Sequence, residues 1–436
     1  MKKLFIAMVM AGFCLLGAGT RVSYAGEIDL LLEKLVDKGV LTGAEAQQVK
    51  YETREQMKKE ITTGKSESLP AWLQKIKLKG DLRLRYQYQH TKNDGDVQKD
   101  VNIGRVRMRL GLEAKINEKL MAGIGIATGS GDPRSTNVTF GNTKYDGSGG
   151  AGYSTKFEIK LDYAYAKYSP LPWLELVGGK MLLKDVFWEP TDLIWDTDIT
   201  PEGGVIGFNK SITPSTSLFM KTGALVVQDD TSSTSDPAMA YIVQAGASQK
   251  VNSDVSLKGA FTMYNFSNIK GATSSGKSSG TNTGNVTKGS SQYAYNYNML
   301  NPALELSIKE PFKAIGGLGV EKLKLFGEYV RNTEAPDRNT GFSMGFQFGK
   351  DKVKKWGDWQ VKYIYAMLEK DAVLDVLPDS DRYGGKTGMR SHEVSFTYGL
   401  GTNTYFGLDV YRSWNIQGSA RKAPETLVQV DWNMKF

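Results

Sequence analysis

The stretch "LKGDLRLRYQYQ" (Leu78–Gln89) decides the fold class, because its side chains alternate between two kinds. One set is apolar or aromatic: Leu78, Leu82, Leu84, Tyr86 and Tyr88. The other is polar or charged: Lys79, Asp81, Arg83, Arg85 and Gln87. A period of two predicts a β-strand with one apolar and one charged face. The apolar face could meet the core of a soluble sandwich, or it could meet lipid while the charged face lines a wet lumen.

The start of the chain predicts export. Two lysines precede the apolar run Leu4–Gly19, and "SYA" (Ser23–Ala25) offers the small residues that a signal peptidase reads. We therefore expect residues 1–25 to be a cleaved signal peptide. Cys14 is the only cysteine of the chain and would leave with that peptide. The mature chain would then have no disulfide and no thiolate chemistry.

The composition favours the membrane barrel. The 436 residues include 48 glycines and 11% aromatic residues, yet the mean hydropathy is −0.36. No stretch after the signal peptide is apolar for long enough to form a membrane helix. A polar average with many glycines and tyrosines is typical of outer-membrane barrels, whose lumen is wet. The net charge of +8 is mild and not clustered on a helix, so we expect no nucleic-acid partner.

Only the N-terminal part of the mature chain has a helical pattern. Apolar residues recur at helical spacing between Ile28 and Val36, and Gly39 follows where a helix C-cap would lie. Thr42 and Glu45 predict a capping box that opens a second helix. We expect residues 26–68 to form a periplasmic helical hairpin or short coiled coil with a linker. A solvated spacer is the alternative.

Residues 69–436 read as strands whose connections alternate between short and long. The short connections are Ile116–Lys119, Ser169–Pro172, Thr213–Thr216, Val251–Asp254, Glu310–Glu321, Asp351–Asp358 and Leu400–Asn403. The long ones are Thr91–Asp100, Gly129–Ser154, Leu183–Gly203, Asp229–Pro237, Ser267–Gln292, Asn332–Thr340, Lys370–Gly388 and Asn415–Pro424. This regularity predicts an all-β fold, an antiparallel transmembrane β-barrel of about sixteen strands with both ends on the short-turn side. A soluble sandwich would not explain the alternation.

Other strands repeat the opening pattern. In "KFEIKLDYAYAKY" (Lys156–Tyr168) the apolar set that we expect to face lipid is Phe157, Ile159, Leu161, Tyr163 and Tyr165. Aromatic residues near strand ends suit the interfacial girdles of a barrel: Trp72, Tyr86, Tyr88, Trp173 and Trp414. His392 shares parity with Val394, so we interpret it as an interfacial residue and not as a partner for Ser391 on the opposite face.

With its signal peptide, its arginine-rich strand "GRVRMRLGLEAKI" (Gly104–Ile116) and its terminal Phe436, the chain resembles a Gram-negative outer-membrane porin. It is most similar to the "putative porin" families related to general and phosphate-selective porins. The segment Leu31–Ala46 resembles the N-terminal periplasmic segment of such porins. The resemblance implies passive diffusion of small hydrophilic solutes and ions, no enzymatic activity, no cofactor and a homotrimer in the outer membrane.

The resemblance also implies a constriction. In porins the third long loop folds into the barrel, and "PEGG" (Pro201–Gly204) is a partial match to the signature of that loop. This loop and its end carry six acidic residues: Asp185, Glu189, Asp192, Asp196, Asp198 and Glu202. Basic wall residues would lie opposite: Arg83, Arg85, Arg105, Arg107 and Arg109. Acid facing arginine would create a transverse field that sorts solutes. The alternative is that these charges form an ordinary solvated wall.

We expect the lumen to favour anions, because the wall also gains Lys79, Lys160, Lys258, Lys324 and Lys362. Two alternatives remain: a channel selective for phosphate or organic acids, and a structural tether that binds peptidoglycan through the N-terminal helices. We interpret "DSDR" (Asp379–Arg382) as solvated loop carboxylates and expect no metal site. With two histidines and no mature thiol, we expect no catalytic residues.

Overall fold

The computed structural model describes residues 32, 34–63, 75–92, 98–129, 132–141, 156–228, 236–273, 284–289, 292–313, 320–416 and 424–436. The chain divides into two compact units, Met1–Gln74 and Lys75–Phe436. The predicted signal peptide and Trp72 lie outside the described residues. Within them, no helix combines the length and the apolarity that would let it cross a membrane.

The N-terminal unit contains the helix α3 (Gly43–Thr63), preceded by a helical turn at residues 34–37. Gly39 has φ +68° and ends that first turn, as the sequence predicts. The capping box is also confirmed: Thr42 N–H donates to Glu45 Oε2 at 2.8 Å, and Glu45 N–H donates to Thr42 Oγ1 at 3.3 Å. The first of these hydrogen bonds lowers the pKa of Glu45.

We expect Thr42→Ala to loosen the first turn of α3 and to leave the barrel unchanged. The substitution removes the side-chain acceptor that holds the first helical N–H groups. Hydrogen–deuterium exchange of those amides should accelerate about two- to fivefold. Gln48→Ala is the matched control, because it removes only the exposed hydrogen bond to Glu52. Equal exchange in wild type and Thr42→Ala would show that the cap does not stabilise the helix.

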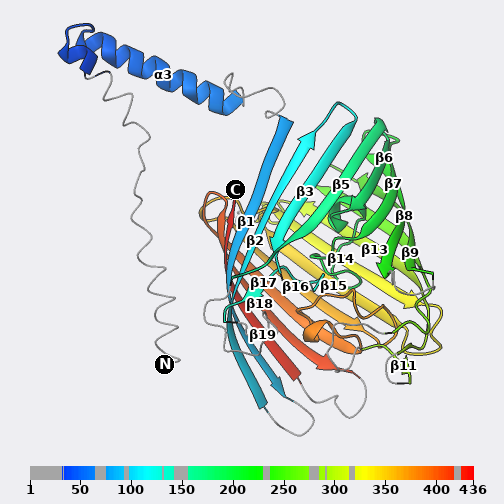
Figure 1. Cartoon of the computed structure of the whole chain (residues 1–436). Coiled ribbons are helices and arrows are strands. Elements are labelled where there is room, and N and C mark those ends of the chain that lie inside the picture. The colour runs from blue at the N-terminus through cyan, green and yellow to red at the C-terminus, as the bar shows by residue number, and fades with distance from the viewer. Residues whose placement is uncertain are drawn as a thin grey trace. The chain divides into compact units, whose positions relative to one another are not determined.

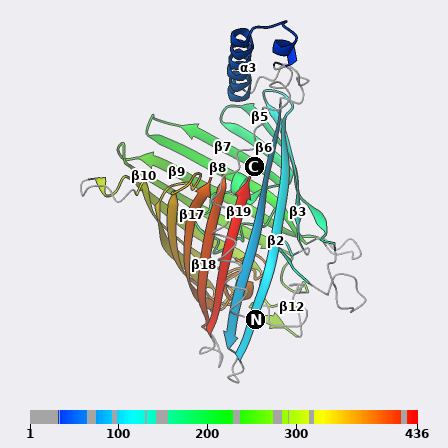
Figure 2. The same ribbon diagram turned by 90° about the vertical axis from the view of Figure 1, so that its left-hand side faces the viewer.

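The second unit is a closed antiparallel barrel of sixteen long strands (Figures 1 and 2). The strands are β1 (Ile76–Lys92), β2 (Gln98–Lys115), β3 (Leu120–Thr128), β5 (Ile159–Leu171), β6 (Leu174–Lys180), β7 (Glu202–Ser211), β8 (Thr216–Gln228), β9 (Ala238–Lys250), β10 (Val255–Ser267), β13 (Tyr297–Lys309), β14 (Lys322–Asn332), β15 (Thr340–Gly349), β16 (Trp359–Leu368), β17 (Met389–Gly401), β18 (Thr404–Asn415) and β19 (Pro424–Lys435). The first strand pairs with the last, from Asp81 opposite Lys435 to Thr91 opposite Glu425. Closure satisfies the backbone groups that lipid cannot.

The alternation of short and long connections is confirmed, and both ends of the barrel lie on the short-turn side. Two of the predicted long loops contain short strands that the sequence pattern missed. The strand β4 (Val138–Thr139) pairs with β2, and β11 (Thr287–Lys288) forms a small hairpin with β12 (Gln292–Tyr293). The expectation of strands alone was also incomplete: the helix α4 (Leu183–Val186) and a 3₁₀ turn at Tyr383–Gly385 interrupt two other loops.

Exposure answers the question raised by the opening stretch. Leu78 is 57% exposed and Leu84 is 37% exposed, whereas Arg85 on the same strand is 6% exposed. The same contrast recurs across the barrel, since Leu304 is 53% exposed and Gln244 is 1% exposed. Apolar side chains therefore cover the outside and polar side chains the inside, which is the arrangement of a membrane barrel.

One expected face was wrong. Tyr163 and Tyr165 point inward, although they follow the lipid-facing Leu161 at period two. The register of β3 against β5 shifts between Gly125 and Ile126, where one extra β5 residue is accommodated. Such a β-bulge reverses the parity of every later residue of the strand. Tyr165 is consequently 8% exposed and packs in the interior.

Candidate functional site

The loop between β6 and β7 (residues 181–201, the β6–β7 loop) crosses the interior of the barrel. Trp188 N–H donates to Gln244 Oε1 on β9 at 2.9 Å. The Thr191 hydroxyl hydrogen-bonds to Glu328 on β14. Both strand residues are buried polar groups of the inner wall. The loop therefore spans the lumen from the strand that it leaves to the strands across the barrel.

The loop between β16 and β17 (residues 369–388, the β16–β17 loop) packs against it. Asp196 N–H donates to Leu377 O at 2.7 Å, and Ser380 N–H donates to Asp196 Oδ2 at 2.8 Å. Apolar side chains from both loops are buried in one cluster: Leu183, Val186, Leu193, Ile194, Ala372, Val373, Leu374 and Leu377. This internal core narrows the lumen below that of an empty sixteen-stranded barrel.

Arg382 ties the two loops to the wall. Its guanidinium is 1% exposed and forms ion pairs with Asp192 of the β6–β7 loop, with Asp379 at 3.8 Å and with Glu393 on β17 at 2.5 Å. Lys362 on β16 adds a second cation, 2.6 Å from Glu393. Oxygen atoms of the three carboxylates lie within 4.8 Å of one another, a spacing that could suit a metal ion. The guanidinium supplies the positive charge that such a cluster requires.

The predicted wall arginines form a ladder on β1 and β2. The arginine ladder comprises Arg83, Arg85, Arg105, Arg107 and Arg109, all on the inner face. Arg83 lies opposite Arg107 in the register, and Arg85 lies opposite Arg105. Like charges opposed across a strand pair repel, so the arrangement requires counter-charges.

Aspartates supply most of these counter-charges. Asp81 accepts from Arg107 at 2.9 Å and from Arg109 at 2.8 Å. Asp431 on β19 binds Arg85 through both oxygens at 2.7 and 2.8 Å. Asp431 lies 3.7 Å from Arg83 as well, and Asp381 lies 3.6 Å from Arg85.

Arg105 differs from the rest of the ladder. Among the residues that the structure describes it forms no ion pair, and its Nη1 donates to Gln87 Oε1 at 3.2 Å. Its Nε is buried without a hydrogen-bond partner. Arg109 is the other accessible member, with 35% of its side chain exposed. These two guanidinium groups are therefore the ones that a solute in the lumen could meet.

The six acidic residues predicted as one group lie in different places. Only Asp198 reaches the ladder, where Arg109 Nη1 is 3.4 Å from its Oδ1. Asp192 and Asp196 face the β16–β17 loop. Burial raises the pKa of Asp196 to about 7, and the neighbouring carboxylates of Asp198 and Asp192 add to the shift. The negative charge of this loop therefore varies near neutral pH.

The remaining three do not face the ladder. Glu189 accepts a hydrogen bond from the Tyr264 hydroxyl at 3.0 Å. Asp185 is exposed on α4. Glu202 shares the outer parity of β7 and pairs with Lys180 at 2.7 Å.

Several partners of these groups could not be predicted from the sequence pattern. The interpretation of Asp379–Arg382 as solvated was wrong, because Asp379 is 7% exposed and Arg382 is 1% exposed. The signal was the apolar run Ala372–Leu377 in a loop expected to face water. Asp81 and Asp431 already lay on the charged parity of their strands, yet only the register shows which arginines they neutralise.

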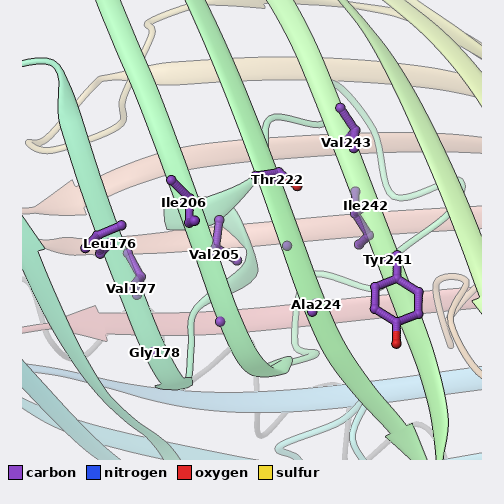
Figure 3. A pocket seen from close by; sticks show the side chains of 12 residues that line it. Leu176, Val177, Gly178, Val205, Ile206, Thr222, Ala224, Tyr241, Ile242 and Val243 are labelled. Atoms are coloured by element: carbon purple, nitrogen blue, oxygen red, sulfur yellow. The ribbon is translucent and has the colours of Figure 1, made fainter.

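An apolar pocket in the outer wall is not part of this pathway. It has a volume of about 550 Å³ and is lined by residues of β6, β7, β8 and β9 (Figure 3). Exposed side chains such as Leu176, Ile206 and Tyr241 border it. They share the outer face, where Gly178 lies opposite Gly204 and leaves the wall thin. The pocket is therefore a groove in the lipid-facing surface.

One known structure supports the fold. The chain is similar to OprB of Pseudomonas putida, with a TM-score of 0.54 and 13% identity over 83% of this chain and 94% of that one. It is also similar to the channel DcaP of Acinetobacter baumannii, with a TM-score of 0.44 and 14% identity over 83% of this chain and 97% of the other. A triple mutant of the Rhodopseudomonas blastica porin gives a TM-score of 0.41 and 11% identity over 83% of this chain and 100% of that one.

No curated protein matches the chain. A protein-family model described as "Putative porin" matches residues 44–101, 89–310 and 292–436, which is most of the sequence. The match agrees with a closed sixteen-stranded barrel, a polar inner wall and loops folded into the lumen. The chain therefore belongs to the "Putative porin" family, the outer-membrane channels through which small solutes diffuse passively.

Proposed function

We propose that this channel favours small anions over cations, that the arginine ladder sets the preference, and that the protein catalyses no reaction. The supporting observation is the charge balance of the ladder. Four of the five guanidinium groups form ion pairs, with the carboxylates of Asp81, Asp198, Asp381 and Asp431. The fifth, Arg105, forms no ion pair among the described residues, and Arg109 on the same strand keeps 35% of its side chain exposed. A charged wall in a narrowed lumen sorts ions by sign.

Arg105→Gln should weaken the anion preference, because it removes the ladder cation that forms no ion pair among the described residues. The mature protein would be reconstituted in a planar bilayer, and the reversal potential would be measured in a tenfold gradient of KCl. We expect the anion-to-cation permeability ratio to fall about two- to fivefold, the effect of one charge a few ångströms from a solvated ion.

Arg390→Gln is the matched control. Arg390 lies at the long-loop end of β17, and its exposed side chain is on the outer face of the barrel and not in the lumen. We expect its removal to leave the reversal potential unchanged. A cation-selective wild type would contradict the proposal and assign selectivity to the carboxylates of the internal loops. An equal shift in both variants would mean that overall charge, and not the ladder, governs permeation.

A substrate-selective channel for phosphate or organic acids is the second candidate. The internal apolar core favours it, because the two packed loops narrow the lumen. Saturable block of the KCl current by added phosphate or succinate would support this candidate. A current that stays proportional to the free ion concentration would support simple diffusion.

We also propose that the protein forms a homotrimer and that its N-terminal helices bind peptidoglycan in the periplasm. The support is the family and the polar, capped helix α3. Removal of residues 27–60 should preserve single-channel conductance. It should reduce trimer formation, measured by chemical cross-linking, or binding to purified peptidoglycan. Full retention of both by the shortened chain would contradict a role for the helices.

A further inference from the structure

Four side chains gather on the outer wall at the long-loop ends of β17 and β18. This outer-rim cluster consists of Arg390, His392, Arg412 and Trp414. Arg390 lies opposite Trp414 in the register, and His392 lies opposite Arg412. They share parity with Val394, which is 45% exposed on the lipid-facing surface. The two strands lie side by side with β19 in Figure 2.

The indole ring of Trp414 organises the cluster. The guanidinium carbons of Arg390 and Arg412 lie 5.4 and 5.7 Å from its ring centroid, within cation–π range. The His392 ring meets it edge-on at 5.7 Å between centroids. Arg412 Nη1 also donates to the Thr426 hydroxyl. Both guanidinium groups are therefore held near one indole ring.

No carboxylate neutralises these two arginines among the described residues. The nearest acid in the same row of the outer wall is Asp100 on β2, three strands from Arg412, and it binds His90 at 2.7 Å. Glu425 on the neighbouring strand lies on the inner face, where it accepts from Gln89. Two uncompensated cations beside hydrocarbon are unfavourable unless an anion meets them there.

We propose that the outer-rim cluster binds a phosphate group of an outer-leaflet lipid. Long loops of outer-membrane barrels are extracellular, so the cluster lies at the level of the outer-leaflet headgroups. Arginine matches phosphate by paired, charge-assisted hydrogen bonds, and basic patches at this depth attract anionic headgroups. Trp414 belongs in the same interfacial layer, where an indole has one apolar face and one polar edge. The occupant is a lipid phosphate because the site faces the bilayer.

The test uses the full mature protein in detergent micelles. The probes are bis-phosphorylated lipid A, the same lipid after chemical removal of its phosphates, and inorganic phosphate. Native mass spectrometry gives the dissociation constant of each lipid. We expect the double variant Arg390→Gln/Arg412→Gln to bind bis-phosphorylated lipid A about thirtyfold more weakly than wild type. The dephosphorylated lipid should bind both proteins equally weakly.

Arg331→Gln is the matched control. Arg331 is exposed on the outer face near the long-loop end of β14, but its register partners are Leu300 and Thr340 and not a second arginine or a tryptophan. Its removal should change the affinity less than twofold. Unchanged single-channel conductance would show that the double variant is folded.

Four results would overturn the proposal. The first is equal affinity of wild type for the phosphorylated and dephosphorylated lipids, which needs no variant. The second is unchanged affinity in the double variant, and the third is an equal loss in Arg331→Gln. Displacement of the lipid by inorganic phosphate at the same concentration would overturn the assignment to a lipid, because a free ion would then suffice.

Discussion

Arg382→Met is expected to release the two internal loops and to raise the single-channel conductance. Methionine keeps much of the side-chain length but removes the charge that Asp192, Asp379 and Glu393 share. Removing one partner of a buried ionic cluster costs about 3–5 kcal/mol, since the remaining charges stay buried and uncompensated. The lost free energy weakens the contact between the loops and the wall, and it leaves the hydrogen-bonded strands of the barrel unchanged.

The measurements are single-channel conductance and limited proteolysis. We expect a protease added from the long-loop side to cut the β16–β17 loop in the variant and to spare it in wild type. Acidic buffer should restore protection, because protonation removes the repulsion among the crowded carboxylates. Arg338→Met is the control, an exposed arginine that forms an ion pair with its neighbour Asp337. Wild-type conductance and protection in Arg382→Met would show that the ion cluster does not hold the loops.

The sequence pattern was sufficient to predict the strands of the barrel wall and most of their inner and outer faces. Period-two alternation identified the two faces of β1 and β2, and the spacing of connections placed most strand ends within a few residues. Alternation and connection length are both local signals, because the polarity of each side chain matches the lipid, water or lumen next to it. The inner face of Tyr163 was mispredicted for a physical reason: a one-residue bulge reverses parity without changing composition.

The interior could be predicted only in part. Charge parity indicated all five arginines of the ladder, but their neutralisation depends on register and on loops far away in the chain. Asp431 is 346 residues from Arg85, and Asp381 approaches the same arginine from the β16–β17 loop. The inward fold of that loop had one sequence signal, the apolar run Ala372–Leu377.

Asp431→Asn is expected to make the channel more anion-selective and the barrel less stable. Asp431 is 4% exposed and receives two hydrogen bonds from Arg85, which is 6% exposed. Loss of its charge leaves Arg85 with Asp381 at 3.6 Å and leaves Arg83 without its carboxylate neighbour. We expect a loss of about 3–5 kcal/mol in the free energy of unfolding, measured by urea denaturation in lipid vesicles. The reversal potential should move toward the anion side.

Two substitutions that remove opposite charges test whether the arginine ladder sets the ion selectivity. Arg105→Gln removes a positive charge from the ladder and Asp431→Asn removes a negative one, so their shifts in reversal potential should oppose each other. Asp100→Asn is the control, because it removes a carboxylate from the outer face of the same strand pair. The double variant Arg85→Gln/Asp431→Asn should recover part of the lost stability, since it removes both buried charges together. If Asp431→Asn left selectivity unchanged while lowering stability, the ladder would serve the fold and the selectivity would reside in the loops.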